Sequence, residues 1–226
     1  PQNLACGVPQ GSVLGPLKFI AYTEDVQTIF RRHLLKYMLF ADEKQVYGSD
    51  IVSNLPSLRA VLSACVVDVA EWCAARRLSL NASKTELIWF GSRHNLSKMS
   101  NLELYITAGP DKITPTSVVR DLGVVLDSEL SELSMKQHVA KVAALCYYHL
   151  RRIRQIRRRV GLEVAIQLVV ALVLSRLDYC NAVLAGLPAS TTEPLQRVQN
   201  CAAHLLFLSR PRDHVRPYLQ RLHWLP

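Results

Sequence analysis

Hydrophobic positions in the first third of the chain switch from helical to alternating spacing and back. Residues 14–30 and 52–77 carry apolar side chains at helical intervals, so we predict a helix over each range. Between them, residues 34–40 and 44–47 are short β-prone runs on either side of a tight turn, which predicts a β-hairpin. These elements already indicate a fold that mixes helices and strands.

The pattern weakens after the second predicted helix. Residues 85–90 read as a strand closed by Gly91, and residues 92–116 read as polar loops around a short strand at 102–106. Residues 118–126 are extended on both sides of a turn. Strands and helices mixed in this way, without a regular βαβ repeat, predict an α+β domain.

Strand signals end at Ser131. From there the apolar spacing predicts an all-helical region interrupted at Gly161 and at residues 186–188. The predicted helices cover residues 132–159, 162–184 and 191–208.

The first of these helices carries an apolar stripe bordered by arginines. The stripe consists of Leu150, Ile153, Ile156 and Val160. The flanking arginines are Arg151, Arg152, Arg154, Arg157, Arg158 and Arg159. Such a stripe can pack inward while its arginine rim contacts a phosphate backbone. A nuclear-localisation run is a weaker interpretation, because the arginines alternate with core positions.

The chain of 226 residues has a formal net charge of +9, and the excess lies entirely in its C-terminal part. Residues 1–130 contain 13 Lys and Arg and 13 Asp and Glu, whereas residues 131–226 contain 14 basic and 5 acidic residues. This asymmetry favours a polyanionic partner for the C-terminal part, since phosphate neutralisation drives nonspecific nucleic-acid binding. A solvated basic face that aids solubility explains the composition equally well.

Six cysteines without a C-x-x-C pair, several of them in apolar helical runs, predict reduced thiols in a nuclear or cytoplasmic protein. Cys201 and His204 have no second pair at suitable spacing, so we expect no zinc site. The sequence shows no secretory leader, and its longest apolar run, residues 165–174, is too short to span a bilayer. We therefore expect no membrane partner.

Residues 7–16 contain three glycines and two prolines. A Gly-rich loop that opens a helix can present backbone amides to a phosphate or a base pair. Ser12 is able to cap the following helix, and Pro16 suits its first turn. Taken alone, the segment is also typical of an ordinary loop.

Two acidic side chains, Asp42 and Glu43, lie at the tip of the predicted hairpin. Carboxylates in such a position can hold magnesium, which prefers hard oxygen ligands. An acidic tip by itself is more often a solvated turn. The order of Gly-rich loop, helix and acidic hairpin is more specific than any one of the three.

On these motifs the chain resembles the reverse transcriptases of non-LTR retrotransposons (LINEs), and most closely their jockey-like group. Residues 7–16 match motif B of that family, and Phe40-Ala41-Asp42-Glu43 stands at motif C, where the family usually carries Tyr-Ala-Asp-Asp. The resemblance continues through residues 78–86 (motif D), 121–127 (motif E), 175–181, 195–200 and 223–226.

The resemblance implies a partial polymerase palm over residues 1–130 and a basic, all-helical thumb over residues 131–226. It implies an RNA-directed DNA polymerase that uses Mg²⁺. Its implied partners are an RNA template, a DNA primer duplex and deoxynucleoside triphosphates.

The resemblance also assigns residue roles. Asp42 is expected to be the catalytic metal ligand, with Glu43 beside it and Lys84 near the triphosphate. Pro9, Gln10, Gly11, Phe40 and Ala41 are expected against the template–nucleotide pair, and Leu122, Gly123 and Val124 form the expected primer grip. Glu43 replaces the usual Asp and is one methylene longer. A displacement of about an ångström at a catalytic group can cost on the order of a hundredfold in rate.

In this family the fingers and motif A precede motif B, and the chain begins at motif B. We therefore expect a truncated copy without polymerase activity of its own. Two alternatives stay open at this point. One is a non-catalytic nucleic-acid-binding module that uses the basic C-terminal helices, and the other is a translation product with no selected role.

Overall fold

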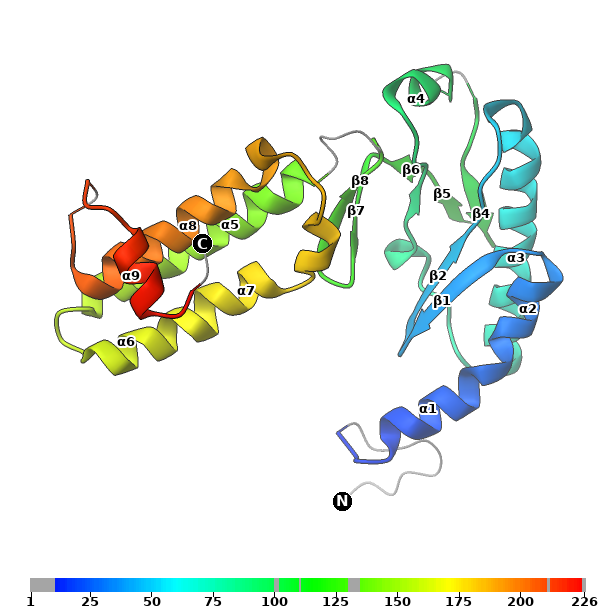
Figure 1. Cartoon of the computed structure of the whole chain (residues 1–226). Coiled ribbons are helices and arrows are strands. Elements are labelled where there is room, and N and C mark those ends of the chain that lie inside the picture. The colour runs from blue at the N-terminus through cyan, green and yellow to red at the C-terminus, as the bar shows by residue number, and fades with distance from the viewer. Residues whose placement is uncertain (1–10, 100–101, 110, 130–134, 211, 225–226) are drawn as a thin grey trace. The chain divides into compact units, whose positions relative to one another are not determined.

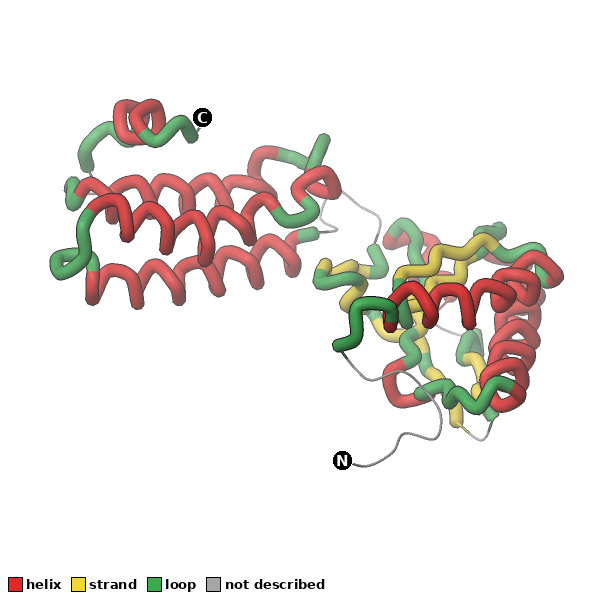
Figure 2. The backbone as a smooth tube through the Cα atoms, turned by 90° about the horizontal axis from the view of Figure 1, so that it is seen from below, coloured by secondary structure: helices red, strands yellow, loops and turns green. Residues whose placement is uncertain are grey.

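The computed structural model describes residues 11–99, 102–109, 111–129, 135–210 and 212–224. The chain divides into two compact units (Figure 1). The first comprises Pro1–Trp89 and His94–Thr116, and the second comprises Phe90–Arg93 and Ser117–Pro226. Helices and short paired strands occur together in the first unit, whereas helices dominate the second (Figure 2). This combination confirms the predicted α+β class.

The first unit begins with the predicted helix, divided into three pieces. These are α1 (Gly15–Thr23), a 3₁₀ turn η1 (Glu24–Val26) and α2 (Gln27–Arg32). Pro16 lies in the first turn of α1 as expected, but the prediction that Ser12 caps the helix is wrong. The N-cap residue is Leu14, and no side chain caps it, while the carbonyl of Ser12 accepts the Gly15 N–H at 3.2 Å.

The predicted hairpin and second long helix are both confirmed. Strands β1 (Lys36–Phe40) and β2 (Glu43–Tyr47) pair antiparallel, with Phe40 opposite Glu43. A 3₁₀ turn, η2 (Val52–Asn54), leads into α3 (Leu55–Ala75). The core between these elements contains fully or almost fully buried side chains of Val26, Phe30, Leu35, Cys65, Val69 and Cys73.

Arg76, which ends α3, fastens α1 and η1 to that helix. Its guanidinium donates to the backbone oxygen of Tyr22 at 2.8 Å and pairs with the Asp25 carboxylate. In return, the Tyr22 hydroxyl donates to the carbonyl oxygen of Arg76 at 2.7 Å. The arginine also stacks on the rings of Tyr22 and Trp72. The start of the chain is therefore held by polar contacts as well as by apolar burial.

Residues 78–116 contain more regular structure than the sequence predicted. The 3₁₀ turn η3 (Ala82–Lys84) precedes β3 (Leu87–Ile88), which is shorter than the strand predicted over residues 85–90. Where polar loops around a short strand at 102–106 were expected, the chain forms α4 (Arg93–Met99), β4 (Ile106–Ala108), β5 (Asp111–Ile113) and β6 (Pro115–Thr116). The predicted strand is therefore displaced, and β4 begins only at its last residue.

The loop prediction failed because these elements are short or polar. No residue of α4 is buried, so its sequence carries no apolar face. β4 pairs antiparallel with β5, and β3 pairs parallel with β6, each over two or three residues. Runs of that length are below what an alternating pattern can reveal.

The second unit starts with a hairpin of β7 (Val118–Asp121) and β8 (Val124–Asp127). The extended segment and its turn were predicted, although Val124 belongs to β8 and not to the turn. Both turn residues have positive φ, +44° at Leu122 and +86° at Gly123, as a two-residue type I′ turn requires.

The helices that follow confirm the two predicted interruptions, but the segment predicted as one helix over 162–184 ends its helical run at Asp178. Residues 132–134 of the first predicted helix lie outside the described residues. The helices are α5 (Lys136–Ile156), α6 (Leu162–Val169), a π-helical turn η4 (Val170–Leu174), α7 (Ser175–Asp178), the 3₁₀ turn η5 (Asn181–Leu184), α8 (Ala189–Phe207) and α9 (Arg216–Arg221). The last of these was not predicted. No helix in the described part of the chain is long and apolar enough to cross a membrane.

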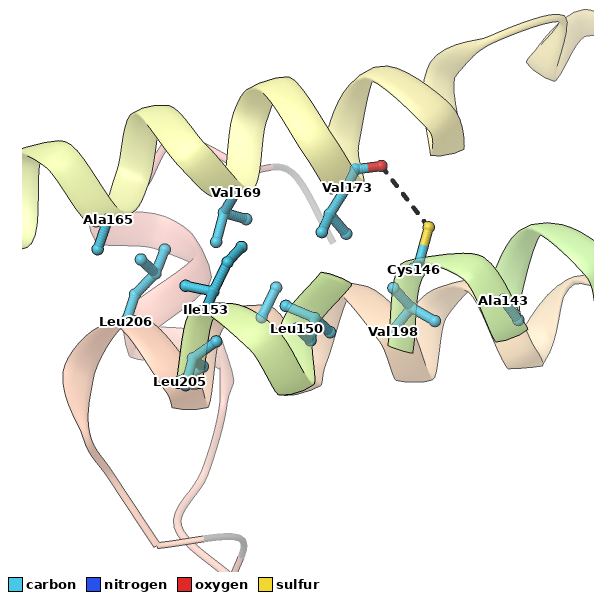
Figure 3. Close-up of a cluster of buried hydrophobic side chains, with 11 residues drawn as sticks. Ala143, Cys146, Leu150, Ile153, Ala165, Val169, Val173, Val198, Leu205 and Leu206 are labelled. Atoms are coloured by element: carbon cyan, nitrogen blue, oxygen red, sulfur yellow. Dashed lines mark hydrogen bonds between the residues drawn. The ribbon is translucent and has the colours of Figure 1, made fainter. Parts of the chain in front are cut away.

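Helices α5, α6, η4 and α8 enclose one apolar core (Figure 3). Cys146, Val169, Val173, Val198 and Leu206 are completely buried in it. The Cys146 thiol points at the carbonyl oxygen of Val173, 3.8 Å away. Among the described cysteines, Cys65, Cys73, Cys146, Cys180 and Cys201 are free thiols, as predicted.

The predicted apolar stripe of α5 is correct for Leu150 and Ile153, which are buried. Ile156 does not belong to it, because its side chain is 40% exposed at the last residue of the helix. The next residue, Arg157, is buried instead.

The two compact units separate between Thr116 and Ser117, so the β7–β8 hairpin belongs to the same unit as the helices. The boundary predicted from the sequence, at residues 130 and 131, marked the change from strands to helices. The assignment of the two parts to a palm and a thumb stays a prediction.

Candidate functional site

The tip of the β1–β2 hairpin brings four predicted site residues together. Ala41 and Asp42 form the two-residue turn, flanked by the paired residues Phe40 and Glu43. Ala41 has φ +53°, and a positive φ at the first central position is what a type II′ hairpin turn requires. All four residues are exposed, so their side chains are available to a ligand.

Asp42 and Glu43 supply carboxylate oxygens, the ligand type that Mg²⁺ prefers. Among the described residues, no three His, Cys, Asp or Glu side chains are grouped closely enough to hold a metal ion. Two-metal catalysis needs ligands that position both ions on the reacting phosphate. The hairpin tip thus fits the chemistry of a magnesium site but provides only part of its ligands.

Lys44 adds a positive charge next to this tip. Its ammonium group lies 3.4 Å from the backbone oxygen of Asp42 and 5.8 Å from the ring centroid of Phe19 on α1. The lysine therefore links the hairpin to the helix that follows the Gly-rich loop.

The remaining residues predicted in the first unit lie on separate elements. Gly11 has φ +85° and open space where a Cβ would stand. Lys84 is an exposed residue at the end of η3, the turn that the Asn81 side chain caps by accepting the Ser83 N–H at 3.1 Å. Pro9 and Gln10 lie outside the described residues.

Of the three predicted primer-grip residues, Leu122 and Gly123 form the β7–β8 turn and contact Tyr179, whereas Val124 begins β8 and is buried. The Tyr179 hydroxyl donates to the carbonyl oxygen of Leu122 at 2.6 Å. Its ring carbon lies 3.4 Å from the position of a Cβ built on Gly123. Gly123 therefore satisfies two constraints at once, a positive φ and the close approach of an aromatic ring.

A second contact fixes the same hairpin to α5. The backbone N–H of Val125 on β8 donates to Nδ1 of His138 at 3.3 Å. His138 is almost completely buried, and this burial lowers the pKa of its imidazole below the ordinary value of 6.5. The ring is accordingly held neutral, which leaves Nδ1 free to accept the hydrogen bond.

The six predicted arginines divide into three groups. Arg157 is buried, and its guanidinium donates to the backbone oxygens of Leu206 at 3.1 Å and Val160 at 3.2 Å, so it joins α5 to the end of α8. Arg151 and Arg154 line a shallow groove of about 400 Å³ between α5 and α8, with Ala144, Tyr147, Leu150 and Cys201. Arg152, Arg158 and Arg159 are exposed outside that groove.

Sequence reasoning missed Tyr179 and His138. Tyr179 stood inside a segment that was noted for its family resemblance, without a role, and its partner Leu122 is 57 positions away. His138 was counted only as part of a helix. No local pattern in the sequence marks the contact that His138 makes.

The sequence model of the family "Reverse transcriptase (RNA-dependent DNA polymerase)" matches residues 1–126. The search of solved structures returns no match.

Two curated proteins of Drosophila melanogaster are similar to the chain. It is 27% identical to the "Probable RNA-directed DNA polymerase from transposon BS" over 164 residues, which cover 70% of this chain and 17% of that protein. It is 26% identical to the "Probable RNA-directed DNA polymerase from transposon X-element" over 153 residues, 62% of this chain and 14% of that protein. The chain thus spans less than a fifth of either relative.

The matched residues include the hairpin with Asp42 at its turn and both strands of the β7–β8 hairpin up to Leu126. They confirm the resemblance to a non-LTR retrotransposon reverse transcriptase that the motifs predicted. The chain belongs to the reverse transcriptase family.

Proposed function

We propose that this chain is the palm region from motif B to motif E, followed by the thumb, of a LINE reverse transcriptase of the jockey-like group. The observation that carries the proposal is the β1–β2 hairpin, which presents Asp42 at an exposed two-residue turn after α1 and α2. An aspartate in that position is free to face a nucleotide and its metal ion. The reaction proposed for the complete protein is RNA-templated DNA synthesis with magnesium.

In this proposal the chain's own groups act by position and charge. Asp42 binds the metal ion, and bound magnesium would stabilise the charge on the transferring phosphoryl group. Phe40, Ala41 and Gly11 contact the template–nucleotide pair, together with Pro9 and Gln10, and Lys84 places a cation near the triphosphate. The turn residues Leu122 and Gly123, with Val124, contact the primer strand.

We also propose that the 226-residue chain by itself has no polymerase activity. Within the residues that the structure describes, Asp42 and Glu43 have no third acidic or imidazole group beside them to complete a site for two metal ions, and the longer side chain of Glu43 shifts its carboxylate. Primer extension on an RNA template with magnesium is therefore expected to give no product. If the wild-type chain extends the primer and Asp42→Ala does not, the proposed inactivity is wrong. That result would require a complete metal site in the 226-residue chain.

A positive experiment supplies further metal ligands. A fusion of the chain to the fingers and motif A of a related element, with Glu43→Asp, is expected to extend a primer. Asp42→Ala in that fusion should abolish extension, and Asp50→Ala, an exposed aspartate beyond β2, should leave it unchanged. Extension that survives Asp42→Ala would exclude Asp42 as the metal ligand.

A second candidate function is nucleic-acid binding by the helical unit without catalysis. It is favoured by the net charge of +9 in residues 131–226 and by the exposure of five of the six arginines between Arg151 and Arg159. Binding through phosphates must weaken as salt rises. An affinity for a duplex that does not change with salt concentration would exclude this function.

A further inference from the structure

A groove lies between the end of α7, the turn η5 and the first turns of α8, within the second unit. Its volume is about 850 Å³, a size typical of ligand pockets. Four leucines line it, Leu174, Leu177, Leu184 and Leu195. All four are only partly buried, and three of them also pack against the core of the unit. The groove therefore offers apolar surface that the fold itself does not cover.

Two carboxylates line the same groove, Asp178 at the end of α7 and Glu193 in α8. They are two of only five acidic residues in the range 131–226, which contains 14 basic residues. None of the described residues that line the groove is Lys, Arg or His. The groove is thus a negatively charged site on a strongly positive unit.

The position of Asp178 makes its end of the groove more negative. Helix α6, the turn η4 and α7 follow one another without a break, so Asp178 ends one long helical run. Carbonyl groups at a helix C-terminus carry partial negative charge, which disfavours a carboxylate and favours a cation there. Among the described residues, no basic side chain forms an ion pair with Asp178. A cation is therefore the group that this end of the groove lacks.

Glu193 is available to a cation as well. Its carboxylate pairs with Arg197 one turn further along α8, at 2.7 Å, and both side chains are more than half exposed. An ion pair exposed to this degree contributes little free energy, so a cation in the groove can replace Arg197 at small cost. The side chains of Asn181 and Ser190 add hydrogen-bonding groups to the lining.

We propose that this groove docks a short basic segment of a partner protein. Apolar side chains of the segment lie against the leucines, and its Lys or Arg side chains pair with Asp178 and Glu193. Such a segment supplies both kinds of group at once, whereas the two carboxylates repel the phosphates of a nucleic acid. A polyamine supplies the charge but leaves the leucines in contact with water. This docking surface goes beyond the proposed polymerase and nucleic-acid functions and does not depend on them.

The test measures binding of a fluorescent peptide of about 12 residues, with leucines at helical spacing and lysines between them, to the 226-residue chain. Asp178→Asn with Glu193→Gln removes both carboxylates of the groove. Glu163→Gln with Asp213→Asn removes the same charge from exposed positions outside it, and an amide at position 213 can still accept the Arg210 N–H. The groove pair is expected to weaken binding about tenfold, and the control pair by less than about twofold.

A second comparison adds charge at neighbouring positions. Ala185→Lys places a positive charge in the groove, and Ala182→Lys places the same charge on an exposed position of η5 outside the lining. Only Ala185→Lys is expected to weaken peptide binding. All the substituted side chains are exposed, so thermal unfolding midpoints should stay close to wild type and identify any variant that misfolds.

The peptide itself is also varied. Alanine in place of its leucines is expected to weaken binding about tenfold, because less apolar surface is then removed from water. Equal binding of the two peptides would indicate a site for cations alone and overturn the proposal of a protein segment.

The remaining outcomes decide whether the groove is the site. A loss confined to the groove pair and Ala185→Lys would support the assignment. Equal losses in both acidic pairs would indicate general attraction between charges and overturn it, as would wild-type protein that does not bind the leucine-containing peptide. None of these results bears on the metal-ligand role proposed for Asp42, which primer extension tests separately.

Discussion

The hydroxyl of Tyr179 lies 2.6 Å from the carbonyl oxygen of Leu122. This hydrogen bond joins the end of the α6–α7 helical segment to the tip of the β7–β8 hairpin, two segments that are 57 residues apart in the sequence. With the bond from Val125 to His138, it holds the hairpin at two points. The hairpin and the helices consequently form one compact unit.

Removing the Tyr179 hydroxyl should loosen the hairpin tip. Tyr179→Phe keeps the ring against Gly123 but leaves the Leu122 carbonyl without its donor, at an expected cost of about 1 kcal/mol in unfolding free energy. Amide hydrogen exchange is expected to accelerate at residues 121–125 and to stay unchanged in the first unit. Tyr148→Phe removes an exposed hydroxyl from the same unit and serves as the control. Unchanged exchange at the hairpin in Tyr179→Phe would contradict this role.

The φ of Leu122 predicts a stabilising substitution. A leucine at φ +44° is strained by about 1–2 kcal/mol, a cost that asparagine tolerates better. Leu122→Asn is therefore expected to raise the unfolding free energy by about 0.5–1 kcal/mol, because the type I′ turn favours Asn-Gly. Leu126→Asn, within β8, should lower it, since its φ is not positive and strands disfavour asparagine. Equilibrium denaturation with urea measures both, and a destabilised Leu122→Asn would refute the strain argument.

The lowered pKa of buried His138 predicts that the second unit loses stability in mild acid. The unfolded histidine takes up a proton below about pH 6.5, whereas burial keeps the folded one neutral to lower pH. Stability present above pH 6.5 is therefore lost as the pH falls from 6.5 toward the lower pKa of the folded state. His149 shifts in the same direction, so a variant is needed to separate the two.

His138→Gln offers that separation, because a glutamine oxygen can still accept the Val125 N–H. Urea midpoints measured between about pH 7.5 and 5 should fall less steeply in this variant than in the wild type. Burial raises the pKa of the Asp127 carboxyl, so its protonation favours the folded state as the pH falls, opposite in sign to the effect of His138. Identical pH profiles in the two proteins would show that His138 does not cause the loss.

Replacing Arg157 should lower the unfolding free energy more than replacing Arg158, the next residue. Arg157→Ala leaves the carbonyl groups of Leu206 and Val160 without a buried donor, with an expected loss of about 2–3 kcal/mol in unfolding free energy. Arg158→Ala removes an exposed side chain and should change stability by less than about 0.5 kcal/mol. Thermal unfolding of both variants tests this difference, and equal midpoints would contradict it.

The sequence was sufficient to predict the elements with strong periodicity. The hairpin at residues 36–47, α3, and the helices on both sides of Gly161 and residues 186–188 were all located, because long apolar repeats and Gly or Pro interruptions are local signals. The family could be recognised from short motifs for a similar reason, since each motif is contiguous.

What the sequence did not provide was information on side-chain orientation and distant partners. An arginine row looks uniform in sequence, yet Arg157 turns inward while Arg152 and Arg154 point to opposite flanks of α5. Ile156 has the right spacing for the core and is nevertheless exposed at the helix end. The partners of Tyr179 and His138 depend on tertiary contacts that no local pattern contains.

The attachment of the β7–β8 hairpin to the helices decides where this protein can be divided. A cut where strands give way to helices, near residue 130, would leave Leu122 and Val125 on one piece and Tyr179 and His138 on the other. A junction at Thr116 and Ser117 keeps both anchors within one piece. Chimaeras that exchange the helical region between related elements should therefore carry the hairpin along as part of the same inherited block.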